Sequence, residues 1–334
     1  MFAFTAGIGA FFWYQRGRTL AQLSRFLLTR GLWLVFLEFT VLRFILFFQW
    51  NWTGALFILT VFWMLGLSMV VLAALVHLPV RILAPVSLAI VATHNLLDPI
   101  ASERFGRFAF LWGILHEQAV FPFRGALFAV AYPLVPWVAV MASGFCFGRI
   151  LLWDRERRRR VFVRLGVILT LAFVVLRVWN HYGDPAKWSH QPTPLFSALS
   201  FLNTTKYPPS LIFLLMTLGP ALIALAFLDR RSFPSRHPLI VFGRVPFFFF
   251  LFHLALAHIL AVVLAALRYG PHRYLLLPPP SLGGPREIFP ADYGFSLPVV
   301  YLVWIAVVAI SYPVCLWYGN LKQRHHEWWW LSYL

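Results

Sequence analysis

Long apolar runs, separated by short polar segments, dominate the sequence. A helix that crosses the ~30 Å hydrocarbon layer of a bilayer needs about 20 mostly apolar residues. Runs of this kind, some of them shorter, recur over the whole chain at 1–14, 31–48, 55–76, 82–97, 126–148, 161–179, 210–228, 245–267 and 297–318. The pattern predicts an all-α fold, a polytopic transmembrane helical bundle with about nine spans. We expect a single domain over residues 1–334.

The composition agrees with a membrane protein. Apolar residues make up 61% of the 334 positions and charged residues 12%, against roughly 45–50% and about 25% in soluble domains. The formal net charge is +17, but the basic residues lie in the gaps between apolar runs, where they set topology rather than bind nucleic acid. Both cysteines, Cys146 and Cys315, lie inside apolar runs, so we expect neither a disulfide nor a metal site.

The basic residues alternate from gap to gap. Gaps 15–30, 77–81, 149–160, 229–238 and the tail 319–334 hold sixteen Lys and Arg in 59 positions, and the four other gaps hold eight in 93. Since basic loops stay in the cytoplasm, we expect a multi-pass protein of the bacterial cytoplasmic (inner) membrane with a cytoplasmic C-terminus. The first run is short and a basic gap follows it. We therefore expect one further span before Met1 and ten spans in the complete protein.

A polar cluster closes the fourth run at the predicted exterior face. His94 and Asp98 lie one helical turn apart and share a helix face, with Asn95 beside them. A carboxylate next to an imidazole fixes its tautomer and raises its basicity, as in a general base. The alternative is that both side chains decorate a helix end at the water interface, and the spacing leaves the two interpretations equal.

Ionisable residues inside the other runs usually face the bundle interior. His253 lies near the middle of run 245–267, where it either bonds a neighbouring helix or relays a proton. His258 is five residues away, a spacing that does not form a helical metal pair. For Glu38 and Arg43, which share one run, we expect an inter-helix ion pair or snorkelling to the interface.

Another polar stretch precedes the run at 210–228. Pro208 and Pro209 suit a helix start, so the residues from Asn203 to Lys206 would lie just before a helix N-terminus, where donors for an anionic or hydroxyl-rich ligand collect. Ordinary loop roles are equally compatible. The Pro/Gly-rich stretch at 278–285 predicts an irregular loop, and the Trp-rich tail an interfacial anchor.

Several segments together resemble the bacterial branch of the heparan-α-glucosaminide N-acetyltransferase family, a group of multi-span, acyltransferase-like membrane proteins. The resemblance covers nearly the whole chain, and its segments from 201 to 210 and from 243 to 253 are specific. The segments are Arg30–Leu34 with Glu38, His94–Asp98, Tyr132–Trp137, Tyr182–Pro185, Phe201–Ser210, Gly243–Pro246 through His253, and Leu331–Leu334.

This resemblance implies an acetyl-CoA-dependent N- or O-acetyltransferase without a metal. It would move an acyl group from cytoplasmic acyl-CoA to an exterior amino sugar, envelope saccharide or glycolipid. Catalytic roles would fall to His94, Asp98 and His253, and Arg244 would hold the phosphates of the coenzyme. The expected acceptor-binding residues are Asn95, Asn180, Asp184, Asn203, Thr204, Lys206 and Tyr207. The lipid bilayer is a further partner, and the pattern leaves room for a homo-oligomer.

The sequence departs from the family at its start. A catalytic His is expected in the exterior loop after the first span, and this chain begins beyond that point, so we expect ~50 residues, holding one helix, to be missing. Two alternatives stay open. One is a transporter or flippase without acyl-transfer chemistry, and the other is an inactive, truncated homologue.

Overall fold

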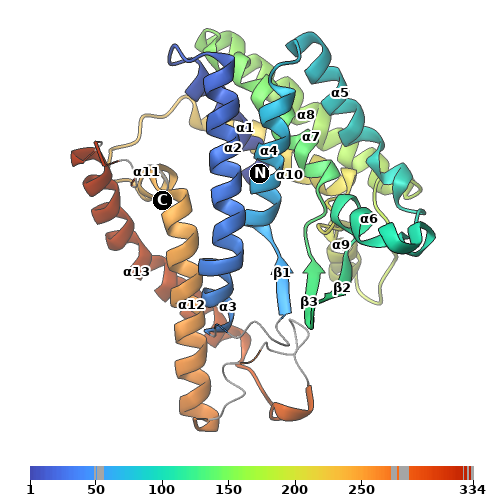
Figure 1. Ribbon diagram of the computed structural model, residues 1–334, viewed down its shortest axis with the longest axis vertical. Helices are drawn as coiled ribbons and strands as arrows, with labels where there is room; N and C mark the ends of the chain where they lie inside the picture. The colour runs from blue at the N-terminus through green and yellow to red at the C-terminus, as the bar shows by residue number, and fades with distance from the viewer. Residues whose placement is uncertain are drawn as a thin grey trace. The chain divides into compact units, whose positions relative to one another are not determined.

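The computed structural model describes residues 1–334 except 49, 51–55, 272–276, 278–285, 326, 329–330 and 332–334. The described chain divides into two compact units (Figure 1). The first consists of Met1–Glu38 and Thr53–Arg231, and the second of Phe39–Trp52 and Ser232–Leu334. The predicted loop at 278–285 and most of the predicted tryptophan anchor lie outside the described residues.

The described chain has six helical segments that are long and apolar enough to cross a membrane. They are Val80–Leu97, Val135–Leu152, Arg155–Trp179, Leu211–Leu228, Pro246–Tyr269 and Leu297–Arg324. Two further predicted runs form shorter apolar helices, Phe2–Tyr14 and Val61–Leu75. The fold is therefore mostly helical and that of a multi-pass membrane protein, as predicted, but six spans rather than nine meet these requirements.

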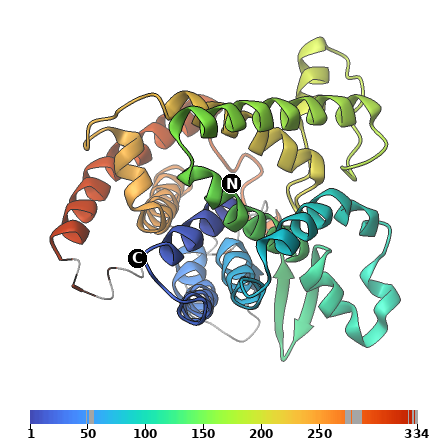
Figure 2. The ribbon, with the colours of Figure 1, turned by 90° about the horizontal axis from the view of Figure 1, so that it is seen from above.

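The first unit is a bundle in which helices pack in pairs. Its helices are α1 (Phe2–Tyr14), α2 (Leu20–Leu37), α4 (Val61–Leu75), α5 (Val80–Thr93), α6 (Ala109–Leu115), α7 (Val135–Phe147), α8 (Arg155–Trp179), α9 (Pro194–Leu202) and α10 (Leu211–Leu228). α1 and α5 pack against α7, α2 packs against α4, and α8 packs against α10. Figure 2 looks along α2 and α4, which lie side by side.

Glycines bring three of these pairs into backbone contact. A Cβ atom at Gly31 of α2 would lie 2.4 Å from the carbonyl oxygen of Gly66 in α4, and one at Gly66 would lie 2.5 Å from that of Gly31. A reciprocal arrangement also joins α8 to α10 through Gly166 and Gly219, whereas α1 meets α7 where Gly7 lies against the backbone of Met141 and Gly144 against that of Phe4. In lipid, where apolar burial gives no drive for association, such close approach supplies the packing energy.

Glu38 connects α2 to α4. Its side chain is 3% exposed, and its carboxylate accepts hydrogen bonds from the backbone N–H groups of Thr60 (2.7 Å), Phe62 and Trp63 (both 3.0 Å). These are orphan donors at the N-terminus of α4, a position that favours negative charge. The burial of this charge is therefore balanced by a helix terminus, a partner that the sequence pattern did not indicate.

A small sheet also belongs to the first unit and was not predicted. β2 (Ala119–Phe123) pairs antiparallel with β3 (Ala126–Val130), and β1 (Leu56–Leu59) pairs parallel with β3. Arg124 and Gly125 join the hairpin with φ values of 48° and 79°, as a two-residue turn with two positive φ angles requires. The run at 126–148 therefore begins as a strand and becomes helical at Val135.

The second unit contains α3 (Arg43–Phe47), α11 (Pro238–Arg244), α12 (Pro246–Tyr269) and α13 (Leu297–Arg324). α12 and α11 pack against α13, and α3 packs against α12. Its core gathers Val241, Val245, Cys315, Tyr318 and Leu331. His258 Nδ1 lies 2.5 Å from the carbonyl oxygen of Ile45 and so connects α12 to α3.

Candidate functional site

The predicted site residues fall into both units. Arg244 and His253 belong to the second unit. The first unit contains His94, Asn95, Asp98, Asn180, Asp184, Asn203, Thr204, Lys206 and Tyr207.

His94 sits where α5 tightens into the single 3₁₀ turn His94–Leu97. Pro99 follows this turn and cannot continue a helix. The two ring nitrogens of His94 lie 2.8 Å from the carbonyl oxygen of Pro209 and 3.0 Å from that of Val91. Because both neighbours are acceptors, the imidazole is held between two backbone segments and ties the end of α5 to the start of α10.

Asp98 binds a second histidine, His116. Asp98 Oδ1 lies 3.0 Å from His116 Nε2, and Asp98 Oδ2 accepts a hydrogen bond of 2.8 Å from Asn95 Nδ2. Asn95 in turn accepts a hydrogen bond of 2.9 Å from the backbone N–H of Leu211, at the N-terminus of α10. The carboxylate is thus fixed on both oxygens, one of which faces an imidazole.

His116 is a buried histidine with one paired ring nitrogen and is a candidate general base. The residue is 2% exposed, and among the described residues its Nδ1 has no hydrogen-bond partner. With Nε2–H donating to Asp98, the neutral ring carries its lone pair on Nδ1. A carboxylate that orients the imidazole and stabilises the imidazolium is the arrangement used in acyl-transfer triads.

The segment around His116 is held by its own hydrogen bonds. His116 follows α6 directly, and the indole Nε1 of Trp112 donates to the carbonyl oxygen of Ile100 at 2.7 Å. The next residue, Glu117, accepts a bond of 2.7 Å from the backbone N–H of Ser102. The 99–118 segment therefore folds back on itself and brings His116 to Asp98, which lies 18 residues earlier in the chain.

Sequence reasoning missed His116. The only available signal was the polar pair of His116 and Glu117 after a short apolar stretch, which occurs in many loops. Helical spacing predicted His94 as the partner of Asp98. The helix instead changes from α to 3₁₀ at His94, and the Asp98 carboxylate faces His116 in the loop after α6.

Asp184 is enclosed by the chain around it. Its Oδ1 accepts bonds from the backbone N–H of Ala186 (2.9 Å) and the hydroxyl of Thr205 (2.6 Å). Its Oδ2 accepts bonds from the backbone N–H of Thr205 (3.0 Å) and the hydroxyl of Ser210 (3.1 Å). Arg177 Nη1 lies 3.6 Å away, and both side chains are 1% exposed.

Arg177 completes this buried hydrogen-bond network. Its guanidinium donates to four backbone carbonyls, those of Ala186, Ser200, Phe201 and Asn203. Asn180 ends α8 in a left-handed conformation, with φ 57°, and its side-chain amide bonds both the N–H and the carbonyl of Trp188. Asp184 and Asn180 thus order the 180–210 segment, and a role of either in acceptor binding stays a prediction.

The 203–207 stretch offers polar groups at the surface. Asn203 and Lys206 are exposed, and the ammonium of Lys206 lies 4.9 Å from the ring centroid of Tyr207. The Tyr207 hydroxyl is 3.0 Å from that of Tyr132. Thr204 is half-buried, with its hydroxyl 4.0 Å from the sulfur of Met216. Asn203 and Lys206 are the predicted binding residues of this stretch that solvent can reach most freely.

In the second unit, His253 is half-buried and its Nδ1 lies 2.7 Å from the carbonyl oxygen of Phe249, one turn earlier in α12. Arg244 is exposed at the last residue of α11. Val245 then breaks the helical path with φ −132° and ψ 49° before α12 begins. Among the described residues, no three His, Cys, Asp or Glu side chains come together as metal ligands would.

An ion pair joins the start of α8 to the end of α10. Arg158 donates to both oxygens of Asp229, from Nε at 3.0 Å and from Nη2 at 2.7 Å. This hydrogen-bonded guanidinium holds the pKa of the Asp229 carboxyl below its usual value. Arg155 also donates to the carbonyl oxygen of Asp229, at 2.9 Å from its Nε. The predicted cytoplasmic end of the first unit is thereby fixed.

No family model, curated protein or solved structure matches the chain.

Proposed function

We propose that this protein is a membrane-bound acyltransferase in which His116, oriented by Asp98, removes the proton from the acceptor. The observation that carries the proposal is the buried His116–Asp98 pair, whose second ring nitrogen has no partner among the described residues. A carboxylate–imidazole pair with one lone pair available serves proton abstraction during acyl transfer. In His94, by contrast, each ring nitrogen faces a backbone carbonyl oxygen.

The proposed reaction moves an acyl group from the thioester of acyl-CoA to an amine or hydroxyl. The acceptor attacks the thioester carbonyl, and its proton passes to Nδ1 of His116. The carbon–sulfur bond breaks, an amide or ester forms, and the coenzyme thiolate takes the proton from the imidazolium, which returns His116 to its neutral form. Asp98 stabilises the imidazolium formed in between, and general base catalysis by the pair would contribute about 10²–10⁴-fold in rate.

Exposed polar residues support the proposed donor and acceptor. Exposed Arg244 in the second unit offers a cation for the coenzyme phosphates, and we keep His253 as a candidate for the acyl path. Exposed Asn203 and Lys206 offer contacts to sugar hydroxyls. We place the enzyme in the bacterial inner membrane with a cytoplasmic C-terminus and propose an amino sugar, envelope saccharide or glycolipid as the acceptor.

Purified protein in nanodiscs, supplied with radiolabelled acetyl-CoA and a panel of amino sugars and bacterial lipid extracts, tests the proposal. We expect label in the acceptor fraction and a loss of about 10²-fold in rate for Asp98→Asn, which removes the charge behind the base. His190→Gln, at an exposed histidine of the first unit, is the control and should leave the rate unchanged. A protein that neither binds acetyl-CoA nor labels any acceptor would favour a transporter and contradict the proposal.

A further inference from the structure

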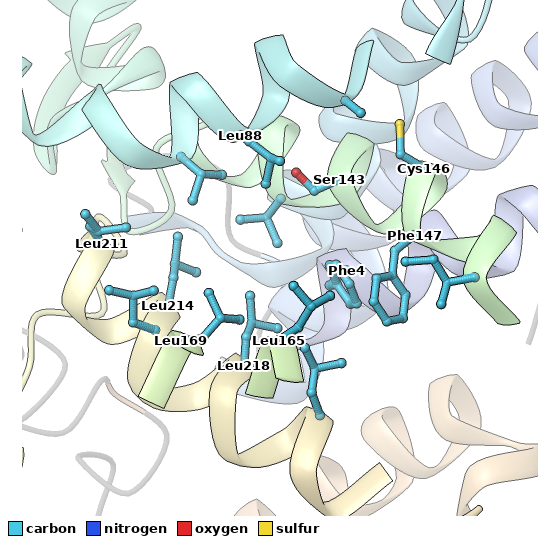
Figure 3. A pocket seen from close by; sticks show the side chains of 16 residues that line it. Phe4, Leu88, Ser143, Cys146, Phe147, Leu165, Leu169, Leu211, Leu214 and Leu218 are labelled. Carbon is cyan, nitrogen blue, oxygen red and sulfur yellow. The ribbon is translucent and has the colours of Figure 1, made fainter. Parts of the chain in front are cut away.

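An elongated apolar cavity of about 330 Å³ lies inside the first unit, between α5 and α7 on one side and α8 and α10 on the other. Figure 3 shows Leu88 and Ser143 facing Leu169, Leu214 and Leu218 across it. Of the sixteen side chains that line it, all but Ser143 and Cys146 are pure hydrocarbon. A space of this size and lining is within the range of ligand pockets and suits an apolar ligand.

The length of the cavity matches half a bilayer. Along α10 its lining runs from Leu211 to Leu222, which is about 16 Å at the helical rise of ~1.5 Å per residue. A hydrocarbon layer of ~30 Å gives each leaflet about 15 Å. The cavity therefore accommodates the length of one extended lipid chain rather than a compact, rounded ligand.

The cavity is partly open, and the helices that line it carry exposed apolar side chains. Leu88 of α5 lines the cavity and is also 59% exposed. On α8, Ile168 and Leu171 are each 58% exposed, as expected for apolar side chains that contact lipid tails. A membrane lipid can thus place a chain into the cavity sideways, without passing through water.

One end of the cavity reaches the candidate site. Val91 and Leu211 line this end. The carbonyl oxygen of Val91 faces His94, and the N–H of Leu211 donates to Asn95, which holds Asp98. A chain in the cavity would therefore carry its polar head beside the carboxylate–imidazole pair.

The opposite end is closed by aromatic rings. Phe4 and Phe147 both line it, with ring centroids 5.1 Å apart, and Phe162 stacks on Phe147 at 5.7 Å. A head group at this closed end would meet hydrocarbon, so the chain terminus belongs here and the head group belongs at the His94 end.

We propose that the cavity binds the hydrocarbon chain of a membrane lipid whose head group lies at the His94 end, and that the acceptor of acyl transfer is the polar head of such a lipid. The proposal rests on the acyltransferase function and specifies its acceptor class as lipid-linked. The lipid would be recognised by its chain in the cavity and by hydroxyl or amine groups at the Asp98–His116 pair.

Photo-crosslinking tests the chain position without relying on activity. The full chain is placed in nanodiscs that contain phosphatidylethanolamine with a diazirine on one tail, a few carbons from the head group, irradiated and mapped by peptide mass spectrometry. We expect label on Leu214, which lines the cavity and is 1% exposed, in addition to lipid-facing residues such as Ile168. Label on lipid-facing residues alone would overturn the proposal.

Two variants of α5 sharpen this test. Ala84 lines the cavity, and Ala84→Trp fills it. Ala89 lies on the same helix, is exposed and does not line the cavity, so Ala89→Trp is the matched control. We expect labelling of Leu214 to fall about tenfold in Ala84→Trp, as a loss of ~1.4 kcal/mol in chain binding gives, and to persist in the control. Equal labelling of Leu214 in both variants would contradict binding in the cavity.

The outcomes separate this inference from the function on which it rests. Acetyl transfer to a water-soluble amino sugar without labelling of Leu214 would refute the lipid acceptor and leave the transferase intact. Labelling of Leu214 without any acyl transfer would support the chain site and refute the transferase. A third arm uses palmitoyl-CoA with a diazirine tail, and label from this probe but not from phosphatidylethanolamine would assign the cavity to the donor and overturn the proposal.

Discussion

Replacement of Asp184 by asparagine removes the negative charge that faces a fully buried arginine. Both carboxylate oxygens accept a bond from a backbone N–H, one from Ala186 and one from Thr205. Whichever oxygen becomes the amide NH₂ group in Asp184→Asn will therefore meet a backbone donor. The guanidinium of Arg177, 3.6 Å away and 1% exposed, keeps its carbonyl contacts but loses its counter-charge.

Removal of one partner of a buried ion pair costs about 3–5 kcal/mol. With ~2–4 °C lost per kcal/mol for chains of 150–250 residues, the lower figure predicts a fall in melting temperature of about 6–12 °C. Fluorescence-detected size-exclusion chromatography of heated, detergent-solubilised protein measures this shift. Loss of the Asp184–Arg177 hydrogen-bond network should also make the 180–210 segment more mobile. Limited proteolysis should then cleave this segment faster than in the wild type.

A matched pair elsewhere in the chain gives the control. Arg268 and Asp292 are also paired, at 2.9 Å, but their side chains are 41% and 69% exposed. Exposed pairs contribute ~0–1 kcal/mol, so Asp292→Asn should melt within about 4 °C of the wild type. Equal melting temperatures for Asp184→Asn and Asp292→Asn would refute the stabilising role assigned to the buried Asp184–Arg177 network.

Three further outcomes follow from the packing and the ion pairs. Gly31→Leu should prevent folding or lower the melting temperature strongly, because a Cβ there meets backbone at 2.4 Å, whereas Gly9→Leu, with open space around it, should not; equal stability would disprove the close helix contact. The lowered pKa of Asp229 means that its bond to Arg158 stabilises the fold above the ordinary carboxyl pKa and is lost as the pH falls through the folded-state value. The melting-temperature gap between wild type and Asp229→Asn should therefore be largest near pH 7 and shrink below about pH 4; a gap independent of pH would refute the assignment. His94→Ala should lower the free energy of unfolding by about 1–3 kcal/mol, because buried carbonyl groups lose their partner, and it should also lower any transfer rate. An unchanged melting temperature would contradict the role of His94 in joining α5 to the start of α10.

Much of the helical architecture could be predicted from the sequence, because long apolar runs have few alternatives in a bilayer. The runs at 161–179 and 210–228 correspond closely to α8 and α10. The sheet could not be predicted, because β3 is an apolar stretch of five residues directly before a helix, and apolar content alone does not separate the two states. Its signal was the Arg124–Gly125 turn, which is short and easily overlooked.

The candidate site could be predicted only in part. Asp98 and Asn95 lie in the cluster that the sequence indicated, since neighbours along a helix end are close in any fold. His116 comes from a segment whose return to Asp98 depends on the Glu117 and Trp112 hydrogen bonds, and no periodicity encodes such a return. Likewise, the spacing of polar residues singled out Asp184, but only the fold shows that Arg177 and Thr205 occupy its oxygens.

Chemical rescue of His116→Ala tests whether His116 acts as the base. Acetyl transfer from radiolabelled acetyl-CoA is measured for this variant with and without added imidazole, next to the wild type. We predict a loss of about 10²-fold or more, with partial recovery when imidazole enters the space left beside Asp98 and a folded protein by size-exclusion chromatography. A folded variant that transfers acetyl at the wild-type rate would contradict the account.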